Sequence, residues 1–176
     1  MVQEAFGFIG RHPTMLVMEQ TLQQQAQAGL LIHGVAGVGK TTLVQGFVQW
    51  LQQNNALEKS IFWFRFDEIR NIEYIVNQMV QGLFGTAALV SPMQQKMDNV
   101  CTVFKQNPFV IVWDNFECVS GSDIDGVDGV DGVDGVDVPP FLTDDDRKQL
   151  KEFLQRLHNG KTKVIITSLL RMILRI

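Results

Sequence analysis

One glycine-rich segment combines residue types and a spacing that are suited to binding phosphate groups. It matches the pattern G-x-x-x-x-G-K-[ST], extended by a second threonine. In order, its residues are Gly34, Val35, Ala36, Gly37, Val38, Gly39, Lys40, Thr41 and Thr42. The glycines allow consecutive backbone N–H groups to surround an anion, while Lys40 adds positive charge and Thr41 a hydroxyl ligand for Mg²⁺. We therefore predict a site for ATP, with GTP as the alternative, and Mg²⁺.

The residues on either side of this loop are those that the chemistry requires. Residues 30–32 form a short apolar run typical of a strand, and apolar residues recur at helical spacing over residues 41–51. A helix that begins near Lys40 turns its positive end toward bound phosphates. The alternative, a turn that only connects a strand to a helix, would not require lysine and threonine at these positions.

A carboxylate follows another apolar run. Residues 109–113 are continuously apolar, as is typical of a parallel strand covered on both faces, and Asp114 comes directly after them. The carboxyl ends of parallel strands form the ligand-binding edge of an α/β sheet. Asp114 is therefore the candidate Walker B acid, which would hold Mg²⁺ opposite Thr41, usually through water. Lys40 and Asp114 are the first two candidate catalytic residues.

Two further residues bear on the hydrolysis of a bound nucleotide. Asn115 stands where many P-loop ATPases carry a second acid, and its amide orients water but does not accept a proton. Glu117 is the nearest alternative base, although it fits a solvated loop residue equally well. We expect slow hydrolysis, with Asn115 or Glu117 positioning the water.

Hydroxyl side chains end the last apolar run, residues 163–167. Thr167 and Ser168 would lie near the γ phosphate if this strand lies between the strands that lead to Gly34 and Asp114. That place would make them sensors of the nucleotide. Both residue types also suit a helix cap, so the two interpretations stay open.

The order of the expected elements predicts the fold class. Strands are expected over residues 30–32, 60–67, 109–113 and 163–167. Helices are expected over residues 41–51, 72–83, 92–105 and 143–158. Because strands alternate with helices, the sheet should be parallel. We predict an α/β P-loop NTPase fold, with a parallel sheet flanked by helices on both faces in three α/β/α layers, as a single domain over residues 1–176.

Four segments in this order resemble the NTPase domain of the STAND class, AAA-related signalling ATPases that include NB-ARC. The segments are Phe8, Ile9, Gly10 and Arg11; GVAGVGKTT; VIVWDNFE; and KVIITS. The resemblance implies a nucleotide-dependent switch that binds ATP or ADP with Mg²⁺, and a protein partner or self-association. It also implies that Phe8 to Arg11, in the lead-in over residues 1–29, lie against the adenine. An ordinary turn explains Gly10 and Arg11 without that role.

The C-terminal end departs from the resemblance. Leu169 and Leu170 precede Arg171, so the arginine that the family often carries directly after the hydroxyl pair is displaced or missing. Family members continue into a further strand, a helical lid and a winged-helix domain, and we expect residues 1–176 to lack the lid and the winged helix. The expectation is either a truncated reading frame or another polypeptide that supplies these parts.

Length, charge and composition limit the other classes of protein that this chain could represent. The 176 residues suit one domain, and the formal net charge of -4 provides no basic field, so no nucleic-acid partner is expected. No run approaches the roughly 20 apolar residues of a membrane span, and no basic leader opens the chain, which favours a cytoplasmic protein. Cys101 and Cys118 lack metal-ligand spacing and are expected to be free thiols.

An acidic, glycine-rich insert occupies residues 120–138, and Asp-Gly-Val repeats over residues 125–136. The repeat lacks the proline of a collagen helix, and its spacing matches neither the EF-hand loop nor the calcium-binding nonapeptide. We expect a solvated loop, with calcium binding as the alternative.

Three functions remain open at this point. The first is a weakly hydrolysing ATP switch, and the second is a nucleotide-binding module or relic without turnover. The third is a small P-loop phosphotransferase, which suits the length of the chain but not the long lead-in before the loop.

Overall fold

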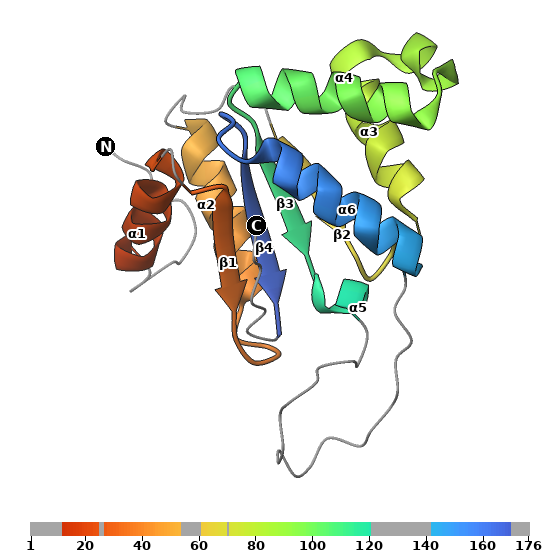
Figure 1. The fold of residues 1–176 in the computed structure, drawn as a ribbon. Helices are drawn as coiled ribbons and strands as arrows, with labels where there is room; N and C mark the ends of the chain where they lie inside the picture. The colour runs from red at the N-terminus through yellow and green to blue at the C-terminus, as the bar shows by residue number, and fades with distance from the viewer. Residues whose placement is uncertain (1–11, 25–26, 54–60, 70, 121–141, 170–176) are drawn as a thin grey trace, which may run out of the picture.

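Four parallel strands form the centre of the fold. The computed structural model describes residues 12–24, 27–53, 61–69, 71–120 and 142–169. Its strands are β1 (Gly29–His33), β2 (Ile61–Arg65), β3 (Val110–Asp114) and β4 (Lys163–Ser168). Neighbouring strands pair in parallel in the order β1-β4-β3-β2, so that β4 lies between β1 and β3 (Figure 1). The parallel sheet predicted from the alternation of elements is confirmed.

Helices connect the strands and flank the sheet. They are α1 (His12–Gln23), α2 (Lys40–Gln53), α3 (Ile72–Phe84), η1 (Thr86–Val90), α4 (Met93–Gln106), α5 (Glu117–Ser120) and α6 (Asp144–Leu157). The four helices expected from apolar spacing are α2, α3, α4 and α6, and their ends differ from the expected ones by no more than two residues. Helix α1, the short 3₁₀ helix η1 and the single turn α5 were not expected from the sequence.

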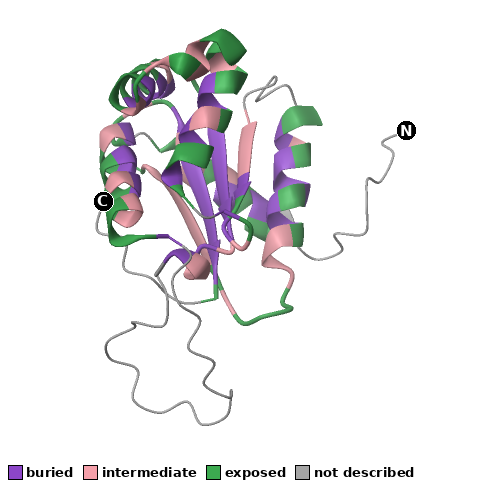
Figure 2. Ribbon diagram, turned by 90° about the vertical axis from the view of Figure 1, so that its right-hand side faces the viewer, coloured by how far each residue is buried: buried purple, intermediate pink, exposed green. Residues whose placement is uncertain are grey.

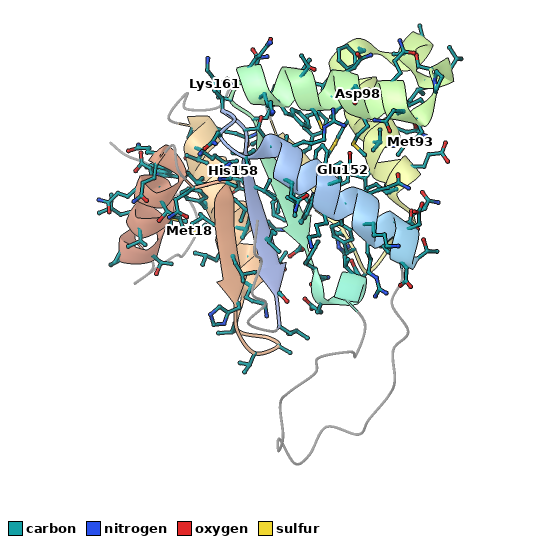
Figure 3. The ribbon with its side chains drawn as sticks, in the orientation of Figure 1. Met18, Met93, Asp98, Glu152, His158 and Lys161 are labelled. Carbon is teal, nitrogen blue, oxygen red and sulfur yellow. The ribbon has the colours of Figure 1, made fainter. Side chains whose placement is uncertain are left out.

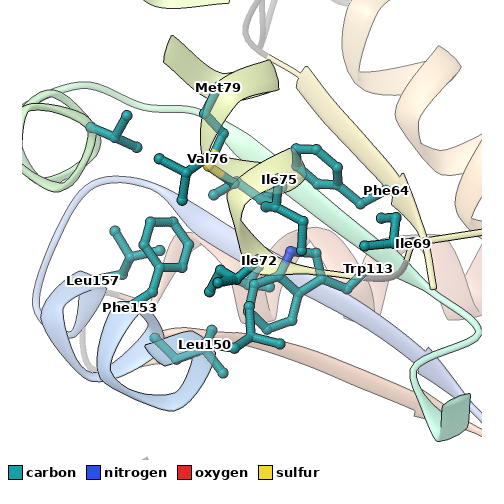
Figure 4. Packing of buried hydrophobic residues seen from close by; sticks show 14 of the residues in the cluster. Phe64, Ile69, Ile72, Ile75, Val76, Met79, Trp113, Leu150, Phe153 and Leu157 are labelled. Atoms are coloured by element: carbon teal, nitrogen blue, oxygen red, sulfur yellow. The ribbon is translucent and has the colours of Figure 1, made fainter. Parts of the chain in front are cut away.

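Both faces of the sheet are covered. Figure 2 shows buried strands in the middle and helices whose outer surfaces are exposed. On one face, α1 and α2 pack over Val110, Val112 and Ile165. On the other, α3, α4 and α6 pack over Ile111 and Trp113, as the close view in Figure 4 shows for Trp113. Successive strand residues point to opposite faces, and both faces are covered, which is why β3 is apolar from Val110 to Trp113. The three-layer α/β/α arrangement is confirmed.

The first and last strands approach closely at Gly29. A Cβ atom at this position would lie 1.9 Å from the carbonyl oxygen of Val164, so a larger residue would force the strands to move. The register then pairs Leu31 with Ile166 and His33 with Ser168. The loop that follows β1 therefore begins beside the hydroxyl residues at the end of β4.

One carboxylate serves the N-termini of two helices. Asp146 Oδ2 accepts hydrogen bonds from the hydroxyl (2.6 Å) and backbone N–H (3.2 Å) of Thr143, which completes the capping box of α6. Asp146 Oδ1 accepts a hydrogen bond of 3.0 Å from the N–H of Ile72, the first residue of α3. Partial burial opposes the charge of Asp146, but these hydrogen bonds outweigh it and hold the pKa of the carboxyl below its usual value.

Helices α4 and α6 lie side by side on the same face. Arg156 of α6 donates to Asp98 of α4 at 2.7 Å, and Asp98 is labelled in Figure 3.

Cys101 is buried on α4, and burial raises the pKa of its thiol to about 11, so it stays protonated at neutral pH. Cys101 and Cys118 are not joined in a disulfide, which agrees with the thiols predicted from the sequence. None of the helices in the described part of the chain has the length and apolar character needed to cross a bilayer.

Candidate functional site

The glycine-rich loop runs from the end of β1 to the start of α2. Gly37 and Gly39 have φ angles of 76° and 86°, in the left-handed region that glycine adopts without strain. Nothing lies within 4 Å of a Cβ atom placed on Gly37, so the backbone angle rather than crowding requires glycine there. At its start the loop is anchored by the N–H of Gly34, which donates to the carbonyl of Ser168 at 3.3 Å.

Lys40 is the first residue of α2, and its side chain folds back over the loop. Its Nζ donates to the carbonyl oxygens of Gly34 at 2.7 Å and Val35 at 3.0 Å. The ammonium is therefore held by neutral acceptors at the mouth of the loop. A phosphate group carries more negative charge than a carbonyl oxygen, so it is a stronger partner for the same ammonium.

Asp114 joins the loop to the sheet. It ends β3, is 1% exposed, and its Oδ1 accepts hydrogen bonds from two hydroxyl groups. One comes from Thr41 at 2.9 Å and the other from Thr167 at 2.5 Å. The Thr41 hydroxyl and the Asp114 carboxylate are hard oxygen donors, the kind that Mg²⁺ prefers. The structure thus brings together the two residues that the sequence nominated for the metal.

Thr167 lies in β4 rather than at the start of a helix. Besides donating to Asp114, its hydroxyl accepts a hydrogen bond of 3.1 Å from the backbone N–H of Asn115. It is 1% exposed, and Ser168 beside it is fully buried. Because β4 lies between β1 and β3, the geometric condition for the sensor interpretation is met.

The segment after Asp114 makes a sharp turn along the same edge. Asn115 has a φ of 57°, a conformation in which asparagine is enriched among residues other than glycine. Glu117, the first residue of α5, is half-buried, and its Oε2 accepts a hydrogen bond of 3.1 Å from the N–H of Leu169. Glu117 is therefore fixed at the end of β4, which argues against the interpretation as a solvated loop residue.

Two aromatic residues that the sequence did not single out support this turn. Phe116 stacks on Trp113 with ring centroids 5.3 Å apart, and its N–H donates to the carbonyl of Thr167 at 2.9 Å. Phe66 packs edge-on against both rings, and its N–H donates to the carbonyl of Asp114 at 2.9 Å. A buried aromatic directly beyond an acid-ending strand was the available signal for Phe116.

Other nominated residues stand apart from these contacts. Thr42 follows Thr41 on α2 and is exposed. The adenine candidates Phe8, Ile9, Gly10 and Arg11, the repeat over residues 125–136 and the displaced Arg171 lie outside the described residues.

The parallel sheet is the middle layer of three. A glycine-rich loop with Lys and Thr follows its outer strand β1, and an acid ends its inner strand β3. Together these features define a P-loop NTPase fold. Within this class, the chain belongs to the family described as Nephrocystin 3, N-terminal, which matches residues 14–169. No match was found among curated proteins.

Solved structures share the same fold at low sequence identity. The ORC2 protein of Aeropyrum pernix, determined as ADPNP-ADP complexes, has a TM-score of 0.61 and 13% identity, over 94% of this chain and 43% of that one. Drosophila ORC bound to DNA has a TM-score of 0.56 and 15% identity, over 96% and 40%. Domain III of the Thermotoga maritima replication initiation protein DnaA has a TM-score of 0.50 and 15% identity, over 94% and 53%. The chain thus spans roughly half or less of these structures.

Proposed function

We propose that this chain is the ATP-binding domain of a signalling ATPase of the STAND type, a nucleotide-dependent switch with slow hydrolysis. The observation that carries the proposal is the pair of hydrogen bonds on Asp114 Oδ1, from Thr41 and from Thr167. They join the loop, the acid and the central strand at the carboxyl edge of the sheet, where nucleotides bind in this class of fold.

Each part of this edge has a role in holding ATP or ADP. The backbone N–H groups of residues 34–39 and the N-terminus of α2 would surround the phosphates, and Lys40 would exchange its two carbonyl partners for the β and γ phosphates. Thr41 and Asp114 would hold Mg²⁺. When bound, the metal neutralises charge on the phosphate oxygens. The lead-in residues Phe8, Ile9, Gly10 and Arg11 are proposed to contact the adenine.

Two residues would position the attacking water. The Asn115 amide lacks a basic group, so proton acceptance falls to Glu117, whose carboxylate is held by the N–H of Leu169. We propose slow turnover, because Lys40 is the cation that the described site supplies for the developing charge. A module that binds nucleotide without turnover is the second candidate, and the amide at residue 115 favours it.

The partner of such a domain is proposed to be a protein. Drosophila ORC, one of the similar structures, is bound to DNA. The net charge of -4 offers no basic field here, so we propose a protein partner or self-association instead of nucleic acid. We place the domain, residues 1–176, in the cytoplasm.

Titration calorimetry with ATP and Mg²⁺ tests the proposal on wild type and on Lys40→Ala. The variant should bind at least about a hundredfold more weakly, since a charge-assisted contact to phosphate contributes roughly 1.5–3 kcal/mol and Lys40 makes more than one. Lys151→Ala, which removes an exposed lysine of α6, should bind like wild type. Equal affinity in Lys40→Ala and wild type, with both folded, would contradict the proposal.

A further inference from the structure

A groove follows the outer edge of β2. Strand β2 and strand β1, which leads into the phosphate loop, form opposite edges of the sheet. The groove has a volume of about 880 Å³ and is lined by all of β2 and by one side of α3. Strand order places β4 and β3 between this groove and β1, the strand that leads into the loop. The volume lies within the range of roughly 300–1,000 Å³ that is usual for ligand sites. The groove is therefore a separate candidate site.

The first wall of the groove is a strand edge. Within the described residues β2 pairs with β3 and with no other strand. An edge strand presents backbone N–H and C=O groups on its open side, and an added strand satisfies them. Over its five residues, at about 3.3 Å each, β2 offers an edge of roughly 17 Å.

The second wall is a row of neutral polar side chains on α3 and at its cap. Asn71, Tyr74, Gln78 and Gln81 all line the groove, and their spacing of three, four and three residues places them on one face of the helix. Tyr74 is 51% exposed. The amides of Gln78 and Gln81 both donate and accept hydrogen bonds, as a peptide group does, while Asn71 Oδ1 already accepts from the N–H of Tyr74. At about 1.5 Å per residue the row extends for roughly 15 Å, close to the length of the strand edge.

The floor between these walls is apolar and carries no net charge. Phe62, Phe64 and Ile69 line it, and the ring of Phe62 lies where a Cβ atom on Gly82 would come within 2.8 Å. The two charged residues of the lining, Arg65 and Glu68, pair with each other at 2.9 Å. A nucleotide or a nucleic acid would find no free positive charge here, whereas alternate side chains of an extended peptide would find an apolar surface.

We propose that this groove binds an extended, uncharged peptide segment of a partner protein, which adds to the sheet as a strand beside β2. The edge of β2 supplies backbone hydrogen bonds, the amide row of α3 contacts the outer side of the peptide, and the floor receives every second side chain. A second copy of this chain fits less well, because it would bring its own α3 against the same wall. The inference does not depend on nucleotide binding.

Titration of the ¹⁵N-labelled full chain tests this proposal by NMR. The probes are four blocked hexapeptides in which threonine alternates with valine, isoleucine, phenylalanine or tyrosine. At least one should shift the amide signals of β2 and of the α3 row, saturating below 1 mM, an affinity of about -4 kcal/mol. The same peptide with an N-methyl group on every residue should bind at least about tenfold more weakly, because neither of its edges keeps the donors that a strand needs.

A double variant tests the amide row. Gln78→Ala with Gln81→Ala replaces two exposed helix residues by a better helix former and should weaken the peptide by about tenfold or more. Gln155→Ala, at an exposed position of α6, should bind the peptide like wild type. The proposal fails if none of the peptides binds, if the N-methyl peptide binds equally well, or if the double variant keeps full affinity. A concentration-dependent dimer whose interface maps to β2 would also overturn it, in favour of a second copy.

Discussion

Thr167 is the residue through which most of the candidate site is connected. Its hydroxyl donates to Asp114 and accepts from the N–H of Asn115, while its carbonyl accepts from Phe116. A threonine hydroxyl has one donor and two acceptor lone pairs, so these contacts use both of its roles. A change in the environment of Asp114 would therefore reach the backbone of the turn that carries Glu117.

Glu117→Gln tests the residue proposed to accept the proton. Glutamine still offers an oxygen to the N–H of Leu169, so the turn should keep its structure while the basic group is lost. Since general bases contribute roughly 10²–10⁴-fold, single-turnover ATP hydrolysis should fall by at least about a hundredfold, with unchanged ATP affinity. Glu152→Gln, at an exposed position of α6, is the matched control. Wild-type rates in Glu117→Gln would favour the second candidate function or another base.

At the scale of elements, Asp146 ties two helices that are far apart in the sequence. One of its oxygens completes the cap of α6 and the other accepts from the first N–H of α3. Both helices pack on the same face of the sheet. Their N-termini are thus held by a single ionised carboxyl.

Asp146→Asn should destabilise the protein at neutral pH by about 1–2 kcal/mol, because an amide has one acceptor oxygen where the carboxylate has two. The folded state lowers the pKa of Asp146, so its contribution is complete above the unfolded pKa of about 3.9 and is lost as pH falls through the lower folded pKa. Urea unfolding at a series of pH values measures this. The gap between wild type and variant should be constant above about pH 5 and shrink below pH 4.

The matched control for this experiment is Asp145→Asn, which makes the same change of charge in the same turn. Asp145 is exposed and its carboxylate accepts from Gln149 within α6. Asp145→Asn should lower the free energy of unfolding by less than Asp146→Asn does. Equal losses would mean that the effect comes from the charge near the helix end and not from the link to α3.

The sequence was sufficient for the main elements because their apolar spacing is regular. Strand β3 is apolar from Val110 to Trp113 and α6 has an acidic first turn after a capping threonine, so both were predicted to within two residues. Helix α1 was missed because its apolar residues do not form a strong stripe, and it is stabilised by packing of Met15 and Met18 beside α2. Local spacing carries no information about such tertiary contacts.

The candidate site was predicted less completely than the fold. The motif nominated Lys40, Thr41 and Asp114, but the use of the Thr167 hydroxyl depends on strand order, which entered the sequence analysis only as a condition. The hydrogen bond from the N–H of Leu169 to Glu117 connects the segment after β4 with the segment after β3. Hydrogen bonds between distant segments follow from the topology and not from any local pattern.

At the scale of the whole molecule, the Asp-Gly-Val repeat is a long insert that lies outside the described residues. Deleting residues 125–136 should leave ATP affinity and the melting temperature nearly unchanged, because doubling the length of a loop costs only about 0.6 kcal/mol. Calorimetry and thermal unfolding of the full chain and the deletion variant, with calcium and with chelator, measure this. A large loss of stability, or a calcium response that the deletion removes, would show that the repeat is a ligand site.

The position of β4 also has a consequence during synthesis. Of the four strands described, it is the last to leave the ribosome, yet it supplies the neighbour of β1 and the inner neighbour of β3, as the pairing of Gly29 with Val164 shows. Before residues 163–168 emerge, no strand joins β1 to β3, so α1 and α2 lack part of the sheet that they cover and β3 keeps an open apolar edge. Chains with exposed edges and apolar faces aggregate or bind chaperones. The nascent protein is therefore most vulnerable just before its translation reaches β4, and folding of the whole sheet must wait for that strand.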